Sequence, residues 1–201
     1  MFTIYFIMAY LIGSISFAII VSNYFKLQDP RSYGSQNAGA TNVMRSGNKK
    51  AALFTLIGDC LKGTLVVYLV ALIAKRYYHH EIAEYIIAMS GFFVIVGHIY
   101  PIFFKFKGGK GVATALGVIL GFNPLCALLA LVSWFIVFKL SKISSLAAIV
   151  TIMITPVYAY IIMGNDVYFG VILLISTLVL YQHKSNIVKL INKSEYKFNK
   201  H

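Results

Sequence analysis

The stretch MFTIYFIMAYLIGSISFAIIVSNYF, residues 1–25, contains no Asp, Glu, Lys or Arg and is mostly apolar. About 20 consecutive apolar residues are enough for a helix to cross the hydrocarbon layer of a bilayer. A secretory signal peptide would begin with basic residues, and this stretch has none. We therefore interpret residues 2–25 as a retained first transmembrane helix.

The rest of the chain repeats this apolar pattern. Of its 201 residues 59% are hydrophobic and 12% are charged, with a mean hydropathy of +0.79, whereas soluble domains carry roughly 25% charged residues. Further spans are expected at 51–74, 83–102, 112–122, 124–140, 146–163 and 167–182. The sequence therefore predicts an all-α polytopic membrane protein, a single domain over residues 1–201, with about seven transmembrane helices, one of them (112–122) short.

Basic residues predict the orientation. A net charge of +12 would suit a nucleic-acid partner, but no contiguous soluble basic segment exists to bind one, so none is expected. With the N-terminus outside, Lys75 and Arg76 lie in an outer loop and Lys62 in a span. The other fifteen of eighteen basic residues, up to Lys200 in the tail, then face inside. Cytoplasmic loops carry such an excess, so we expect the C-terminus inside.

The inner side also carries the chemically informative segments. The first loop, RSYGSQNAGATNVMRSGNKK at 31–50, combines small hydrogen-bonding residues with single arginines. Arg45 can direct two N–H groups at a phosphate, and hydroxyl and amide partners come from Ser35, Asn37, Thr41 and Asn42. The alternative is a flexible linker.

The glycine-rich turn, FKFKGGKGVAT at 104–114, points most strongly to an anion. Its lysines, Lys110 among them, supply positive charge. Its glycines let backbone N–H groups turn toward a ligand, and they are Gly108, Gly109 and Gly111. It is not a Walker A loop, because Gly111 follows Lys110 where Ser or Thr is required. We expect a phosphate site here.

Three ionisable residues of the predicted spans are candidates for the site. Asp59 and Lys62 in GDCLKG stand three apart on one helical face and can pair. Charges inside a bilayer face a cavity or each other, so the pair either positions the neighbouring loop or contacts substrate. His98, near the inner end of its span, is either a packing residue or a catalyst.

Two further segments complete the inner face. Ser144 and Ser145 in SKISSLAA begin a span, where a helix N-terminus attracts anions, although simple capping is the alternative. In HKSNI, His183 and Asn186 stand three apart and can face one site, while the remaining basic tail is expected to contact lipid head groups. We expect no metal and no cofactor, because the spans contain no paired aspartates that could hold a metal ion.

These segments carry a resemblance. GSIS (13–16), GSQNAGATNVMR (34–45), GDCLKG, GHIYPIFFKFKGGKGVATALG (97–117), SSLAA (144–148) and HKSNI follow one another in a characteristic order and spacing. The chain resembles the bacterial acyl-phosphate-dependent glycerol-3-phosphate acyltransferases, the PlsY family. Ser16 departs from the proline usual in that family, which bears on the bend of the first span.

The resemblance implies acyl transfer from acyl phosphate to the 1-hydroxyl of sn-glycerol 3-phosphate, giving lysophosphatidic acid and phosphate at the cytoplasmic face of a bacterial plasma (inner) membrane. By motif matching, the catalytic residues are Ser35, Arg45, Lys110 and His183. Substrate would be bound by Asn37, Thr41, Asn42, Gly108, Gly109, Gly111, Ser145 (or its neighbour Ser144) and Asn186, with Asp59, Lys62 and His98 in support. The partners implied are glycerol 3-phosphate, acyl phosphate, membrane lipid and the enzyme that supplies acyl phosphate.

Other classes of protein account for less of this pattern. A transporter for a phosphorylated small molecule would also use buried charges and broken helices, but its site should lie near the bilayer midplane between repeats. Here every unusual polar cluster falls at one face and the halves show no repeat. A non-catalytic lipid-binding scaffold leaves the spacing of the segments unexplained.

Overall fold

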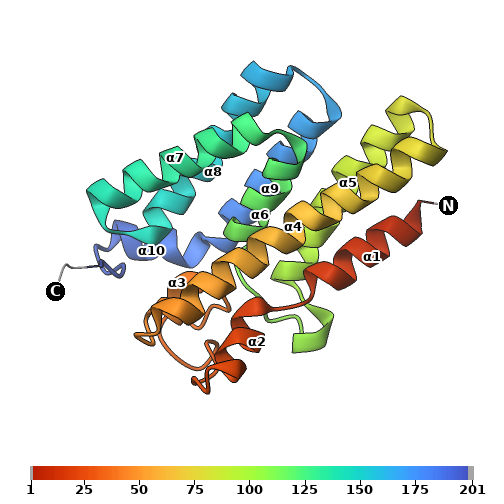
Figure 1. Ribbon diagram of the computed structural model, residues 1–201. Coiled ribbons are helices and arrows are strands. Elements are labelled where there is room, and N and C mark those ends of the chain that lie inside the picture. Colours follow the sequence, from red (N-terminus) through yellow and green to blue (C-terminus); the bar gives the residue numbers. More distant parts are fainter. Residues whose placement is uncertain (1, 199–201) are drawn as a thin grey trace. The chain divides into compact units, whose positions relative to one another are not determined.

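The computed structural model describes residues 2–198, so Lys200 of the basic tail lies outside the described residues. Within them the chain is helical, without strands (Figure 1). The all-α prediction is confirmed. The elements are α1 (Thr3–Gly13), α2 (Phe17–Tyr24), α3 (Ala40–Met44), α4 (Lys49–Tyr77), α5 (His80–Ile99), the 3-10 helix η1 (Ile102–Phe104), α6 (Val112–Phe122), α7 (Pro124–Ser141), α8 (Ser144–Met163), α9 (Val167–Gln182) and α10 (Lys184–Ile191).

Two compact units make up the chain, unit 1 over Met1–Phe122 and unit 2 over Asn123–His201. The single domain over 1–201 therefore stays a prediction. Each unit has its own helix contacts: α1 to α6 pack within unit 1, and α7 to α10 pack within unit 2.

The prediction of a polytopic membrane protein is confirmed. Among residues 2–198, five helical segments are long and apolar enough to cross a bilayer, namely Thr3–Tyr24, Lys49–Tyr77, His80–Phe104, Pro124–Ser141 and Ser144–Met163. A sixth span results if α9 and α10, bent by 57°, are one segment, and α6 is a shorter apolar helix. The count of seven and the orientation of the two ends stay predictions.

The first span is broken in its middle. α1 ends at Gly13 and α2 begins at Phe17, with Ser16 in extended backbone at φ −92° and ψ 100°. The break thus forms with serine at the position where proline is usual. Two hydrogen bonds tie this end of α1 to the segment after α5: the Ile102 N–H donates to Ser14 Oγ at 3.4 Å, and the Tyr10 hydroxyl donates to Tyr100 O at 2.9 Å.

Small residues let the helices of unit 1 touch backbone to backbone. A Cβ atom at Gly13 would meet the backbone of Val94, and one at Gly97 would meet the backbone of Tyr10, so α1 and α5 interlock. The short α6 sits against α4 in the same way, because a Cβ atom at Gly117 would meet the backbone of Cys60. Such close approach is a main source of helix association in lipid.

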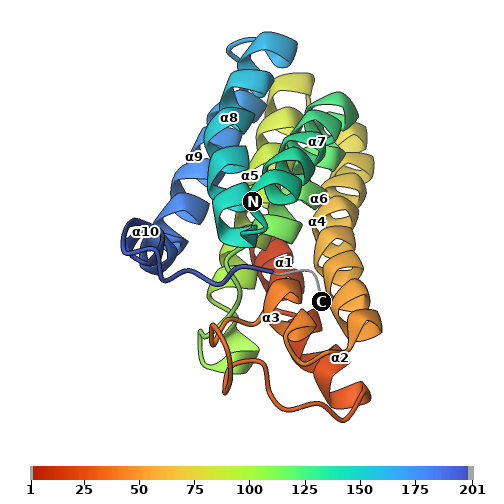
Figure 2. The same cartoon turned by 90° about the vertical axis from the view of Figure 1, so that its left-hand side faces the viewer.

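Unit 2 is a helical hairpin extended by two further helices. Pro124 occupies the first turn of α7, whose N-cap Asn123 accepts a hydrogen bond from Cys126 N at 3.0 Å. α8 packs against both α7 and α9, and Asp166 caps α9 by accepting from Phe169 N at 2.8 Å. Figure 2 shows α8 and α9 side by side, with α10 turned away from the axis of α9.

Candidate active site

The first loop is built around one buried amide. Asn42 is only 1% exposed. Its Oδ1 accepts from the backbone N–H of Ser35 at 3.0 Å, and its Nδ2 donates to Pro30 O at 2.6 Å and Tyr33 O at 3.1 Å. These three bonds hold residues 30–35 against α3. The amide predicted to contact substrate is therefore engaged inside the loop, and its part in substrate binding stays a prediction.

Arg45 lies along the same small substructure. Gly34 has φ +57°, and a Cβ atom there would meet Asn42 Oδ1 and stand 3.2 Å from Arg45 Cδ and 3.3 Å from Arg45 Nη1. Because residue 34 is glycine, the Arg45 side chain can pass directly beside it, one residue before Ser35. The loop thus brings together Ser35 and Arg45, two of the predicted catalytic residues. Asn37 and the exposed Thr41 lie in the same loop and at the start of α3.

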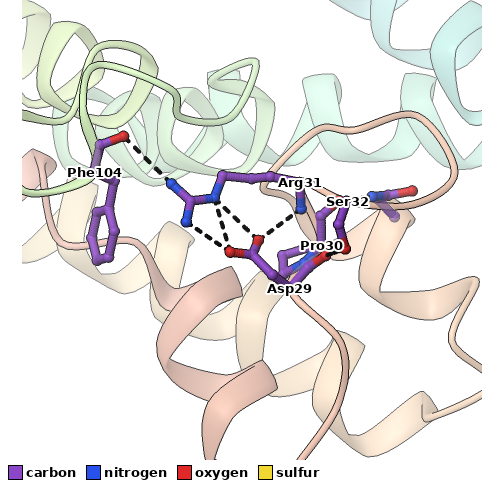
Figure 3. A network of polar contacts seen from close by, with 6 residues as sticks. Asp29, Pro30, Arg31, Ser32 and Phe104 are labelled. Carbon is purple, nitrogen blue, oxygen red and sulfur yellow. Dashed lines mark hydrogen bonds and ion pairs between the residues drawn. The ribbon is translucent and has the colours of Figure 1, made fainter.

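Arg31, held by an ion pair within the first loop, links that loop to η1 (Figure 3). Arg31 Nη2 is 2.7 Å from Asp29 Oδ2, and Arg31 Nε donates to both Asp29 oxygens at 3.1 and 3.2 Å. Arg31 Nη1 also donates to Phe104 O at 3.4 Å, with the guanidinium 5.8 Å from the centre of the Phe104 ring. The hydrogen bonds from Arg31 lower the pKa of Asp29 below its usual value. Arg31 therefore joins two segments of the predicted site.

The glycine-rich turn folds back on the end of α5. The N–H of Gly108 donates to Ile99 O at 3.2 Å, and that of Gly109 donates to His98 O at 3.1 Å. A Cβ atom at Gly108 would meet His98 O, and one at Gly109 would meet His98 Nε2 and stand 2.7 Å from Ala38 O. Glycine is thus required at both positions by close packing. The expectation that these two N–H groups turn toward a ligand is wrong, because α5 carbonyls take them. Their contribution to phosphate binding is a prediction only.

A buried triad lies beneath this turn. Lys62 Nζ is 2.9 Å from Asp59 Oδ1 and 2.9 Å from His98 Nδ1, and His98 Nδ1 is 3.4 Å from Asp59 Oδ1. Asp59, Lys62 and His98 are 2%, 4% and 6% exposed. The predicted pairing of Asp59 with Lys62 is confirmed, and His98 joins it from α5. Lys62 also donates to Gly13 O at 3.0 Å and Ile15 O at 2.7 Å in the broken first span.

Unit 2 carries its own polar cluster at the α10 end. His183 is 3% exposed, and its Nδ1 lies 2.8 Å from Val179 O. Because a carbonyl oxygen only accepts, Nδ1 carries a proton, and in the neutral ring the lone pair is on Nε2. Asn186 Nδ2 donates to Glu195 Oε2 at 2.7 Å. At the start of α8, which α10 contacts, Ser145 Oγ is buried without a hydrogen-bond partner among residues 2–198.

Two acidic residues near these clusters, Asp29 and Glu195, were not predicted from the sequence. Asp29 positions Arg31, and Glu195 accepts from Asn186 and from Tyr196 N at 3.1 Å. The available signal was their rarity, because the chain has only six Asp and Glu residues and these two fall among the lysines of the predicted inner side. An isolated acid in a basic segment indicates a specific partner.

The predicted site residues therefore fall into two sets. In unit 1, Arg31 joins the first loop to Phe104 at the start of the glycine-rich turn, and His98 joins that turn to the triad. Unit 2 holds Ser145, His183 and Asn186. Convergence of Arg45 and Lys110 with His183 stays a prediction, because each unit is described by itself. In the described part of the chain, no group of three or more His, Cys, Asp or Glu residues suits a metal ion.

Known proteins resemble the chain over nearly its whole length. The model of the glycerol-3-phosphate acyltransferase family matches residues 3–193. A glycerol-3-phosphate acyltransferase of Chromobacterium violaceum is 50% identical over 190 residues, which cover 94% of this chain and 91% of that protein. One of Methylobacillus flagellatus is 49% identical over 197 residues, or 98% and 97% of the two chains.

Solved structures agree with these relatives. A crystal structure of PlsY, described as an integral membrane glycerol 3-phosphate acyltransferase in its glycerol 3-phosphate form, has a TM-score of 0.89 at 33% identity and covers 98% of this chain and 96% of that one. Its lysophosphatidic acid form has a TM-score of 0.87, again at 33% identity, and covers 98% and 95%.

Proposed function

The chain belongs to the glycerol-3-phosphate acyltransferase family, and we propose from this premise that it uses acyl phosphate as the acyl donor. A fatty acyl group passes to the 1-hydroxyl of sn-glycerol 3-phosphate, and lysophosphatidic acid and inorganic phosphate are the products. The observation that carries the proposal is the joined cluster of unit 1, in which the loop bearing Ser35 and Arg45 packs on the glycine-rich turn that bears Lys110. Membership of this family does not favour a transporter.

Charge supports a donor that carries phosphate. Both acyl phosphate and glycerol 3-phosphate are multiply charged anions at neutral pH, and Arg45 can hold one of them in a forked pair of hydrogen bonds. Lys110 stands just before the N-terminus of α6, Val112–Phe122, where the helix dipole adds positive potential. Cations placed beside two phosphates orient the reactants and stabilise the charge that develops on the leaving phosphate.

We propose a direct transfer without a covalent intermediate. The glycerol hydroxyl oxygen attacks the acyl carbonyl carbon, and the bond between that carbon and the phosphate oxygen breaks with its electron pair going to phosphate. The hydroxyl proton passes to His183 Nε2, the ring nitrogen left with a lone pair, or to a substrate phosphate oxygen. The buried Ser145 hydroxyl, with no protein partner among the described residues, is suited to donate to a phosphate oxygen.

Location follows from the same reasoning. We propose that the protein is a multi-pass protein of a bacterial plasma (inner) membrane, with its N-terminus outside and its site at the cytoplasmic face. The support is the distribution of basic residues between the expected loops. Acyl phosphate then arrives from the membrane or from the enzyme that makes it, and that enzyme is the proposed protein partner.

The donor is tested with purified protein in nanodiscs, palmitoyl phosphate and radiolabelled glycerol 3-phosphate, without coenzyme A or acyl carrier protein. The expected result is labelled lysophosphatidic acid with one phosphate released per lysolipid. Arg45→Gln and Lys110→Gln should each lose about tenfold or more in kcat/KM, because a charged partner is left unpaired. Lys139→Gln, in the last turn of α7, is the matched control with the same chemical change and should keep normal kinetics.

Two outcomes would contradict the proposal. Product formation with palmitoyl-coenzyme A but not with palmitoyl phosphate would show that the donor is wrong. An acylated Ser35 or Ser145, trapped by mass spectrometry after mixing the protein with donor alone, would rule out the direct transfer.

A further inference from the structure

The break in the first span leaves backbone carbonyls that need a partner. The last carbonyls of a helix have no intrahelical donor, and water cannot serve them inside a bilayer. Here Gly13 O and Ile15 O both accept from Lys62 Nζ, at 3.0 and 2.7 Å. The ammonium group also suits the negative end of the α1 dipole. Lys62, on α4, therefore caps a helix that is distant in sequence.

The same ammonium group reaches the glycine-rich turn through one histidine. Lys62 Nζ is only a donor, so His98 Nδ1, 2.9 Å away, must be the acceptor and the ring proton is on Nε2. That opposite edge of the ring lies against Gly109, where a Cβ atom would meet it. Asp59, 2.9 Å from Lys62, compensates the buried charge. A continuous path of contacts thus runs from the break to the turn.

Direct contact of this lysine with substrate is disfavoured by its surroundings. Lys62 is 4% exposed, and an ammonium group has three N–H donors. Two backbone carbonyls, a carboxylate and an imidazole nitrogen already surround its Nζ atom. A phosphate oxygen would have to displace one of these buried groups and leave it unpaired.

We propose that Lys62 is a positioning residue: its ammonium group locks the break in the first span to the glycine-rich turn through His98, and so fixes where that turn presents Lys110. The inference rests on the proposed function only in making Lys110 a phosphate ligand. Asp59 and His98 belong to the same assembly and touch no substrate.

The first test measures backbone protection without any substrate. In Lys62→Met, hydrogen exchange should accelerate about tenfold or more both at residues 13–17 and at residues 108–111, the loss expected for a hydrogen bond to a charged group. The matched control is Lys75→Met on the same helix, which removes an ion pair with Glu84 of 3.0 Å from a lysine side chain that is 59% exposed. Exchange at both segments should then be unchanged. Normal protection at 108–111 in folded Lys62→Met would overturn the proposal.

A second variant separates the two ends of the path and covers the case in which Lys62→Met fails to fold. In His98→Asn the amide oxygen stands near the position of Nδ1 and can still accept from Lys62, but the ring edge against Gly109 is gone. Exchange should accelerate at 108–111 and stay slow at 13–17. If both segments change to the same extent, or if exchange accelerates only at residues 13–17, then His98 does not connect Lys62 to the turn as proposed.

A charge swap tests whether the ion pair alone matters. Asp59→Lys with Lys62→Asp keeps a lysine–carboxylate pair three residues apart but moves the ammonium group away from Gly13 O and Ile15 O. Protection should not return. Full protection in the swapped protein would reduce the role of Lys62 to charge pairing and refute the capping role.

The KM for glycerol 3-phosphate distinguishes a positioning role of Lys62 from a role in stability alone. If Lys62 only stabilises the fold, Lys62→Met lowers the unfolding temperature and the yield, while the molecules that fold keep a normal KM for glycerol 3-phosphate. The positioning role predicts a KM raised about tenfold, in parallel with the faster exchange. If the wild-type protein shows no acyl transfer, the proposed function fails, whereas the exchange results still decide the role of Lys62.

Discussion

Asn42 is the buried amide that holds the first loop in shape, and its replacement by aspartate should destabilise that loop and so lower activity. The carboxylate can still accept from Ser35 N, but it cannot donate to Pro30 O or Tyr33 O, at 2.6 and 3.1 Å in the native loop. Two hydrogen bonds worth about 1 kcal/mol each are lost, and two carbonyls are left facing a negative oxygen, which costs about 1–3 kcal/mol more.

The loop is therefore destabilised by at least about 3 kcal/mol, a factor of at least about a hundred in the population of its native form. We expect kcat/KM to fall between about tenfold and a hundredfold, depending on how much of that cost substrate binding recovers. The assay is the initial rate of lysophosphatidic acid formation at varied glycerol 3-phosphate, together with hydrogen exchange over residues 30–45. In Asn42→Asp, hydrogen exchange at these residues should accelerate even without substrate. Loss of a residue that only binds substrate would not change exchange in the free protein.

Asn48→Asp is the matched control, because it places the same new charge close by on the chain. Asn48 caps α4 by accepting from Ala51 N at 2.9 Å, and aspartate serves this position as well as asparagine. Kinetics close to wild type are expected. Normal kcat/KM in Asn42→Asp would refute the reasoning, and so would equal losses in both variants, which would assign the effect to charge rather than to the amide.

Three other predictions concern the packing and the polar contacts. Gly117→Ala pushes a methyl group into the backbone of α4 and should lower the free energy of unfolding by a few kcal/mol. Gly170→Ala is the control, because a Cβ atom there has no neighbour within 4 Å, and its unfolding temperature should be equal to or higher than that of wild type. Equal losses of stability in the two variants would contradict the close packing of α6 on α4. Glu195→Ala should lower acyl transfer several-fold by removing the acceptor of Asn186, and Glu195→Gln, which keeps an acceptor oxygen, should restore most of it; no difference between the two would count against this contact. The lowered pKa of Asp29 means that its ion pair stabilises the fold above the ordinary value of 3.8 and that this contribution is lost as pH falls through the lowered value. The unfolding temperature of wild type should therefore drop more steeply than that of Asp29→Asn below about pH 4, and parallel curves would exclude the contribution.

The helices were predictable because hydropathy decides them in a bilayer. Apolar runs at 51–74 and 146–163 correspond to Lys49–Tyr77 and Ser144–Met163. Hydropathy alone did not place the break at residues 14–16, since the first 25 residues contain no charged residue and lipid-exposed helices tolerate Gly and Ser; only the family resemblance indicated a bend there. Two carbonyls at the break accept from an ammonium group contributed by α4, a contact that local sequence does not reveal.

The site was predictable as a set of segments but less so as a set of roles. The spacing of Asp59 and Lys62 correctly indicated a pair, because residues three apart share a helical face. Gly108 and Gly109 were predicted for backbone freedom toward a ligand, whereas the structure uses them for close contact with His98. Asn42 shows the same limit, since an amide that binds substrate and one that binds carbonyls look identical in sequence.

The interlock of Gly13 with Val94 and of Gly97 with Tyr10 has a consequence for biosynthesis. The ribosome delivers α1 to the membrane before α4 and α5 have been made, so the earliest helix spends part of translation without the surface it fits. The break after α1 stays without its hydrogen-bond donor, Lys62 of α4, and without its packing surface on α5 until both of these helices have emerged. Chains truncated before residue 97 and released should therefore be the ones that membrane quality-control proteases remove, and chains truncated after Phe122, the end of unit 1, should survive longer.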